Sequence, residues 1–265
     1  MPRDFKSLPI VVICRDRLAP LRELLDWLEE AEYTRILLVD NASTFPPLVD
    51  FLATVDVEVV RLDRNLGHLG PWTTKVRARL DSDGPFVVTD CDVVPDDDCP
   101  ADVVEHLAGL LLSHADIDKV GLGLRIDDLP DCYALKEQAV AWESQFWEVE
   151  IAPKVFRAEV DTTFALYHSP VRPHGTARAL RTGAPYVARH LPWYADSAHP
   201  TEEQRYYRQH ADLSVSHWET DRPGDNLVRL LQMRADQVAT REIVVETGAG
   251  GISGACSDHD GVARE

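Results

Sequence analysis

Two aspartates, Asp90 and Asp92, follow the apolar run 84–89 and are separated by one residue. In an open α/β sheet, ligands bind outside the carboxyl ends of the strands. Carboxylates placed there can hold a hard divalent cation, which takes oxygen ligands and often shares them with substrate phosphates. The spacing alone favours a solvated turn, whereas the position after a fully apolar strand favours a metal site. The neighbouring acids 96–98 are expected to form a solvated turn or a helix N-cap.

A second acidic group follows the apolar run 34–40, which ends in Asp40 and continues with Asn41 and Ser43. A carboxylate at this strand end can accept a hydrogen bond from a ribose hydroxyl or from the imide N–H of a uracil. The alternative is an Asx turn that begins the loop. When Asp90 and Asp92 are considered as well, the ligand-binding interpretation and the turn interpretation of Asp40 are evenly matched.

A glycine-bearing loop follows the third predicted strand and contains Asn65, Gly67 and His68. Its backbone N–H groups lie before a predicted helix over 73–80, where they could cradle an anion. The alternative is an ordinary exposed loop, because two nearby glycines, here Gly67 and Gly70, are a common pattern.

Two further candidates come from the second half of the chain. Asp161 is expected on a strand within the segment 155–167, where a carboxylate could take the proton of an attacking hydroxyl or simply cap a turn. His190 ends the predicted strand 184–190, where its imidazole could complete a metal shell, contact a diphosphate or have a structural role. His217 is the reserve candidate for the same metal shell.

Alternating strands and helices must position these side chains. Short apolar runs alternate with segments of helical spacing, a pattern that predicts a parallel sheet with right-handed crossovers and helices on both faces. The expected strands are 9–14, 34–40, 57–61, 85–89, 119–126 and 184–190, and the segment 155–167 contains a strand-like stretch at 164–167. The expected helices are 21–32, 48–54, 73–80, 102–114, 135–149, 200–210 and 225–236.

Composition limits the classes of function. The 265 residues carry a net charge of −18, which argues against non-specific binding to nucleic acid or to an anionic membrane. An anionic substrate would need a cation or a local basic cluster beside it. No run approaches the roughly 20 apolar residues of a membrane span, and no signal peptide is evident. Five scattered cysteines suit a reducing cytosol, so we expect a cytoplasmic protein.

Three motifs carry a resemblance to a known family. Leu-Val-Asp-Asn-Ala-Ser at 38–43, Asn-Leu-Gly at 65–67 and Thr-Asp-Cys-Asp-Val-Val-Pro at 89–95 occur in this order. Together they resemble the glycosyltransferases of the GT-A fold, in particular the family-2-like members. The resemblance covers about the first 115 residues, and the later half looks like a bacterial subgroup.

The resemblance implies one GT-A domain over 1–245, with a mostly parallel, Rossmann-like sheet. Residues 1–115 would form the nucleotide-sugar-binding half and 116–245 a mixed acceptor-side half. The remaining 246–265 are rich in glycine and charge, a composition typical of a disordered tail.

The resemblance also implies roles for single residues. Asp92, with His190 or His217, would bind Mn²⁺ or Mg²⁺ at the donor diphosphate, and Asp90 would face the ribose or the metal. The family's usual inverting base lies in a Glu-Asp motif that is absent here, so Asp161 is our candidate base and the stereochemical outcome stays open. The remaining donor-binding candidates are Cys14, Arg15, Arg17, Asp40, Asn41, Ser43, Asn65, Gly67 and His68.

We therefore expect a metal-dependent enzyme that moves a sugar from a nucleotide donor, a UDP-sugar, to a hydroxyl of a small molecule or glycan. One alternative is a nucleotidyltransferase, although the loop after the first strand, 14–17, lacks the glycines that such enzymes use. The other is a catalytically inactive module that binds a nucleotide sugar or a glycan.

Overall fold

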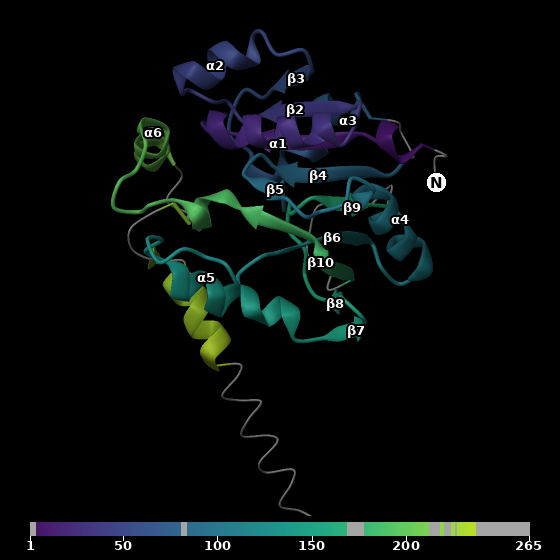
Figure 1. The fold of residues 1–265 in the computed structure, drawn as a ribbon. Helices are drawn as coiled ribbons and strands as arrows, with labels where there is room; N and C mark the ends of the chain where they lie inside the picture. The colour runs from purple at the N-terminus through teal and green to yellow at the C-terminus, as the bar shows by residue number, and fades with distance from the viewer. Residues whose placement is uncertain are drawn as a thin grey trace, which may run out of the picture.

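The structure is a computed structural model that describes residues 4–80, 84–168, 178–211, 218–219, 224–225 and 227–236. A single ten-stranded sheet runs through this part of the chain, in the order β3-β2-β1-β4-β9-β6-β10-β8-β7, with β5 paired to β10 (Figure 1). The order reverses after β1, because β2 and β3 lie on one side of it and β4 on the other.

The first half of the sheet is parallel. Its strands are β1 (Ile10–Cys14), β2 (Ile36–Asp40), β3 (Glu58–Arg61) and β4 (Phe86–Asp90). They alternate with the helical elements α1 (Leu18–Glu30), α2 (Pro46–Leu52), η2 (Gly67–Trp72) and α3 (Thr74–Arg77), after the N-terminal turn η1 (Phe5–Ser7). The carboxyl ends of these four strands therefore meet at one edge of the sheet.

The second half of the sheet is mixed. Strand β9 (Ala165–Tyr167) runs antiparallel between β4 and β6 (Lys119–Leu124), and β6 pairs in parallel with the long β10 (Ala179–His190). The antiparallel strands β5 (Val93–Pro95), β7 (Glu150–Ala152) and β8 (Val155–Arg157) complete it. The helical elements of this half are α4 (Val103–Ser113), α5 (Lys136–Glu143), η3 (Ser144–Trp147), η4 (Leu191–Tyr194) and α6 (Glu202–His210).

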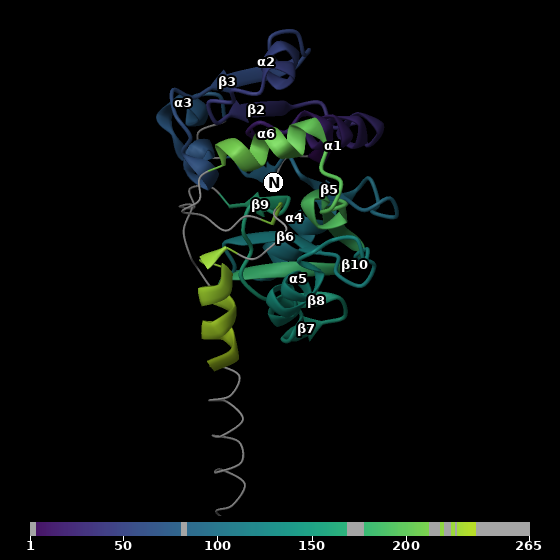
Figure 2. The same cartoon turned by 90° about the vertical axis from the view of Figure 1, so that its left-hand side faces the viewer.

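The core lies on both faces of the sheet, which explains why the strands read as continuous apolar runs. Alternate residues of β1 point to opposite faces, so that Val12 packs with the buried leucines of α1 and Val11 packs with Val76 of α3. Figure 2 shows α1 and α3 on either side of the parallel strands. The expected α/β class, with a parallel N-terminal half and a mixed C-terminal segment, is confirmed by this topology.

Most of the predicted elements are present, and the errors concern short strands and the lengths of helices. The strand-like stretch expected at 164–167 is confirmed by β9, but the prediction that Asp161 lies on a strand was wrong, because β8 and β9 are separated by a loop, 158–164, that carries it. Neither of the three-residue strands β5 and β7 was predicted. The expected helix 135–149 is shorter, since α5 ends at Glu143. The tail 246–265 lies outside the described residues.

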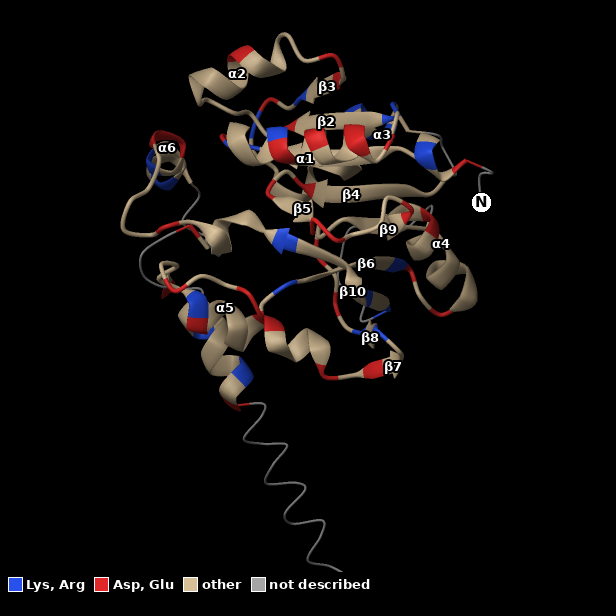
Figure 3. Cartoon of the chain, in the orientation of Figure 1, with Lys and Arg blue, Asp and Glu red and all other residues tan. Residues whose placement is uncertain are grey.

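Acidic residues are spread over both halves of the surface rather than gathered in one patch (Figure 3). One prediction about these acids was wrong: Asp96 is buried and bonds to Arg125 at 3.0 Å, instead of forming a solvated turn. None of the described helices has the length and apolar character needed to cross a lipid bilayer.

Candidate functional site

A cavity of about 840 Å³ opens at the carboxyl ends of β1 and β4. It lies where the strand order reverses, which is the usual place for a ligand in an open α/β sheet. Its walls come from both halves of the chain. The predicted site residues that line it are Arg15, Arg17, Asn41, Asn65, Gly67, His68, Asp90, Asp92, Asp161 and His190.

Five acidic residues line this cavity, and three of them, Asp90, Asp92 and Asp161, lie near one another. Strand β9 brings Asp161 to the acids of β4, because its antiparallel pairing places Thr162 next to Asp90. The Asp90 N–H donates to the Thr162 carbonyl at 2.9 Å, and the Thr162 hydroxyl donates to the Asp90 carboxylate. Burial first, and then the charges of Asp92 and Asp161, raise the pKa of Asp90 well above its usual range.

Arg17 holds the acidic end of the cavity together. Its Nε lies 3.4 Å from an Asp92 oxygen, and its Nη1 lies 2.9 Å from a Glu219 oxygen. The ring of Tyr207, on α6, lies 3.8 Å from the guanidinium. Burial lowers the pKa of Arg17, but Asp92, Tyr207 and Glu219 raise it by more than burial lowers it, so the guanidinium keeps its charge. Sequence reasoning found neither Glu219 nor Tyr207, because both come from segments far along the chain.

His190 reaches the same place through a strand that the sequence did not predict. Strand β5 pairs with β10 so that His190 lies opposite Val93, directly after Asp92. The His190 Nε2 atom is 3.7 Å from an Asp92 oxygen. Burial lowers the pKa of His190 to about 4, although Asp92 opposes this shift. The imidazole is therefore neutral at pH 7, the form that can bind a metal.

The donor set fits a hard divalent cation that arrives with a phosphate ligand. Mg²⁺ is commonly held by one or two carboxylates together with substrate phosphates and water, and Asp90 and Asp92 supply such carboxylates. Among the described residues, no three His, Cys, Asp or Glu side chains form a metal site by themselves. His190 fits less well, because its Nδ1 is buried without a hydrogen-bond partner in the described structure, whereas metal-binding histidines normally use that atom to fix the ring.

Three predicted donor-binding residues face the protein interior rather than the cavity, which corrects those predictions. The Asp40 side chain is fully buried; one oxygen accepts from the Ser43 N–H at 2.8 Å and the other pairs with Arg61 at 2.7 Å. The Ser43 hydroxyl accepts from the Asp16 N–H. The buried Cys14 thiol faces the Val39 carbonyl at 3.7 Å. Asp40 thus forms the Asx-type turn that was the alternative interpretation.

The loop around Gly67 also differs from the expected anion cradle. The Gly67 N–H donates to the Asn65 side chain at 2.9 Å, and the Leu66 N–H donates to the Asn41 side chain at 3.2 Å. The helix that follows, α3, has four residues. These N–H groups are therefore satisfied within the loop, which forms a wall of the cavity while Asn41 ties it to β2.

The opposite end of the cavity contains residues that the sequence analysis did not single out as site residues. Lys119 and Arg181 come from the neighbouring strands β6 and β10, while Trp142, Glu143 and Phe146 come from α5 and η3. The sequence offered one signal for this end of the cavity, a lysine and an arginine within apolar strands. Charged side chains are rarely buried unless they are paired, so such residues indicate a site.

Comparisons with known proteins give structural matches only. No model of a protein family matches the chain, and a search of curated proteins finds no significant match. Matching solved structures include glucosyl-3-phosphoglycerate synthase from Mycobacterium tuberculosis in complex with phosphoglyceric acid, at 16% identity over 61% of this chain and 56% of that one, with a TM-score of 0.38. A crystal structure of the same synthase with Mn²⁺, UDP-glucose and phosphoglyceric acid matches at 15% identity, with the same coverage and score.

A structure described only as a mycobacterial protein matches at 14% identity over 69% of this chain and 67% of that one, with a TM-score of 0.44. The matched region spans little more than half of the synthase. At these identities and TM-scores the matches carry no argument about this chain.

Proposed function

We propose that this protein is a metal-dependent glycosyltransferase that moves a sugar from a nucleotide donor, a UDP-sugar, to a hydroxyl group. One observation carries the proposal: Asp90, Asp92 and Asp161 converge on a single cavity at the point where the strand order reverses. A protein with a net charge of −18 gains nothing in stability from crowding three carboxylates there. Such crowding is expected where function requires it.

In this proposal, Asp92 and Asp90 hold Mn²⁺ or Mg²⁺ against the diphosphate of the donor. The bound cation would stabilise the charge that grows on the leaving diphosphate, as a Lewis acid. Arg17 fixes the Asp92 carboxylate in position, through the contact at 3.4 Å. The nucleoside end of the donor would lie toward Arg15, Asn41 and the loop around Gly67, which line the cavity on the side of β2.

Asp161 is the proposed base for the acceptor hydroxyl. It lies in the 158–164 loop, and its side chain is exposed to the cavity. The hydroxyl oxygen forms a bond to the anomeric carbon while the bond from that carbon to the diphosphate breaks, and the hydroxyl proton passes to the Asp161 carboxylate. Thr162, bonded to Asp90, fixes this loop to the acids of β4.

A turnover assay tests this function. The protein is incubated with Mn²⁺ and a panel of UDP-sugars, and release of UDP is measured by chromatography, with and without candidate hydroxyl acceptors. We expect UDP release from at least one donor, loss of transfer in Asp161→Asn, and unchanged UDP binding in that variant. Retained transfer by Asp161→Asn would refute the base assignment.

Absence of turnover with every donor, together with tight UDP binding, would identify the inactive binding module instead. The matched control is Asp127→Asn, since the Asp127 side chain is exposed and does not line the cavity.

A further inference from the structure

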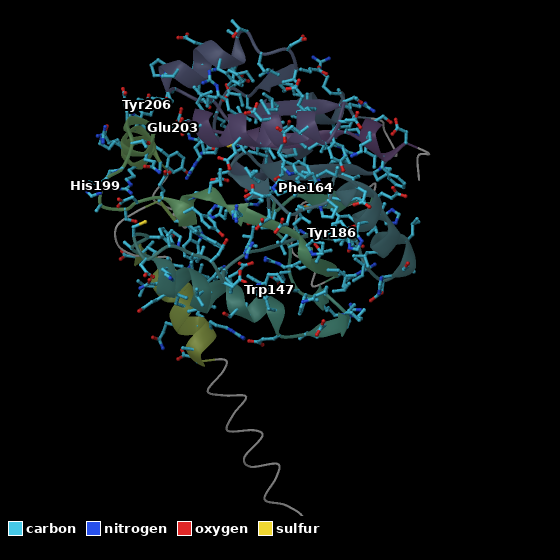
Figure 4. All side chains as sticks on the ribbon, viewed as in Figure 1. Trp147, Phe164, Tyr186, His199, Glu203 and Tyr206 are labelled. Atoms are coloured by element: carbon cyan, nitrogen blue, oxygen red, sulfur yellow. The ribbon has the colours of Figure 1, made fainter. Side chains whose placement is uncertain are left out.

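The end of the cavity away from the nucleotide side forms a distinct half, defined by Lys119, Trp142, Glu143, Phe146, Glu159 and Arg181, which we call the acceptor half. Two glycines of β6 let neighbouring residues pack closely on the sheet beside it. A Cβ at Gly121 would lie 2.5 Å from Val160, and one at Gly123 would lie 2.5 Å from the Trp147 ring. The 158–164 loop and Trp147, labelled in Figure 4, can therefore lie directly on the sheet.

The arginine of the acceptor half is already committed to partners in the protein. The Arg181 guanidinium forms an ion pair with Glu143, and both side chains are almost completely buried. Its Nε donates to the Glu159 carbonyl at 2.6 Å, and the Phe146 ring lies 3.9 Å away. An anionic ligand could recruit Arg181 only by leaving Glu143 as a buried, unpaired carboxylate, which is strongly unfavourable.

The lysine of the acceptor half faces more negative charge than it can neutralise. Lys119 is buried, and in the described structure its Nζ makes one hydrogen bond, to the Tyr167 hydroxyl at 3.4 Å. Its nearby acids are Asp161, Glu159 and Asp118, and Asp118 is neutralised by an ion pair with Arg178 at 3.1 Å. The charges of Arg181 and Glu143 cancel. Lys119, Glu159 and Asp161 then give this half of the cavity a net charge of −1. The spare N–H donors of Lys119 can therefore bond a ligand oxygen, while an added anionic group would be repelled.

Two aromatic side chains complete this half. The rings of Trp142 and Phe146 lie edge to face, 6.0 Å apart, and both line the cavity. Aromatic surface combined with a few convergent polar groups is the usual lining of a site for a small organic ligand. Carboxylates accept from hydroxyl groups and an ammonium donates to them, so this lining matches a compact molecule that has many hydroxyls.

From these contacts we propose that the acceptor half binds an uncharged, polyhydroxylated ring, a neutral sugar unit, and rejects acceptors that carry a carboxylate or a phosphate. This inference rests on the proposed function, whose acceptor it names. The Glu143–Arg181 pair is the specificity device, because it withholds the arginine from anionic ligands.

Equilibrium binding of matched sugars tests the inference. The probes are the methyl glycosides of glucose, galactose and mannose, compared with the corresponding methyl glucuronide and methyl galacturonide and with glucose 6-phosphate. Each is titrated by saturation-transfer NMR, with and without saturating UDP and Mn²⁺. We expect at least one neutral glycoside to bind, and its anionic counterpart to bind about tenfold more weakly or worse.

Two results would overturn the inference: anionic sugars binding as tightly as neutral ones, or UDP binding while no neutral glycoside binds. Both would leave the proposed function standing. Failure of UDP and Mn²⁺ to bind would count against the proposed function, and the titrations without UDP would still decide the sugar preference.

A variant isolates the specificity device. Glu143→Gln frees the charge of Arg181, so we expect the discrimination against anionic sugars to shrink by about tenfold while UDP binding is unchanged. Glu137→Gln, an exposed change on the same helix, should leave the discrimination intact. Glu159→Gln removes one exposed negative charge without breaking the buried pair, and it should shift the preference in the same direction if Glu143→Gln does not fold. An unchanged preference in both cavity variants would refute the role of this charge pattern.

Discussion

Lowering the pH should destabilise this protein through His190, and replacing that histidine by glutamine should remove the effect. In the folded chain, burial holds the pKa of His190 near 4, whereas an unfolded histidine titrates near 6.5. Between these two values the unfolded chain binds a proton that the folded chain does not. The free energy of unfolding therefore falls as the pH is lowered through this window.

The size of the effect follows from the two pKa values. At pH 7 neither state binds much proton, so the histidine contributes almost nothing to the difference. At pH 5 the unfolded histidine is largely protonated and the folded one is not, which lowers the free energy of unfolding by about 2 kcal/mol. The loss would grow to about 3 kcal/mol near pH 4, where protonation of the folded form begins to limit it.

Urea denaturation at pH 7 and pH 5 measures this loss for the original chain, for His190→Gln and for His168→Gln. His168 is an exposed control. We expect His190→Gln to lose about 2 kcal/mol less than the original chain between the two pH values, and His168→Gln to behave like the original. An equal loss in all three proteins would show that His190 titrates normally, and so is neither buried nor neutral as described here.

Two further predictions concern the residues that position the site. Gly121→Ala should displace the 158–164 loop, since the added Cβ would lie 2.5 Å from Val160. We therefore expect the rate of sugar transfer to fall in this variant while its UDP affinity is unchanged. The control is Gly109→Ala in α4, whose Cβ would meet nothing within 4 Å and which should raise the free energy of unfolding by about 0.5–1 kcal/mol. Arg17→Gln leaves Asp92 and Glu219 without their shared cation and should lower the free energy of unfolding by about 3–5 kcal/mol in urea titrations. The double variant with Glu219→Gln should recover part of that loss, and strictly additive effects would contradict the ion-pair account.

The sheet edge that carries the site could be predicted from the sequence for simple reasons. The strands that end in Asp40 and Asp90 are buried on both faces, so each appears as an unbroken apolar run followed by polar residues. Parallel strands bring their carboxyl ends to one edge, which placed Asp90, Asp92 and the 15–17 loop around one cavity. These inferences use only local pattern and the handedness of connections.

Other parts of the site depend on pairings that no local pattern encodes. The three-residue strand β5 is too short to show a period, yet its pairing with β10 is what brings His190 to Asp92. For Asp40 the local pattern was misleading. Its position at a strand end suggested ligand binding, but its second oxygen accepts a hydrogen bond from Arg61 of the neighbouring strand β3. The contact of Tyr207 with Arg17 depends on α6, where Glu203 accepts from the first N–H groups of α1 (Figure 4).

Calorimetric titration of UDP in the presence and absence of Mn²⁺ tests the central claim most directly. The acids at the end of β4 should make UDP affinity metal-dependent, so we expect binding with Mn²⁺, loss of about tenfold or more in EDTA, and the same loss in Asp92→Asn with Mn²⁺ present. Asp98→Asn, an exposed acid of the following loop, should bind like the original chain. Metal-dependent UDP binding that survives in Asp92→Asn, or UDP affinity indifferent to Mn²⁺, would contradict the account.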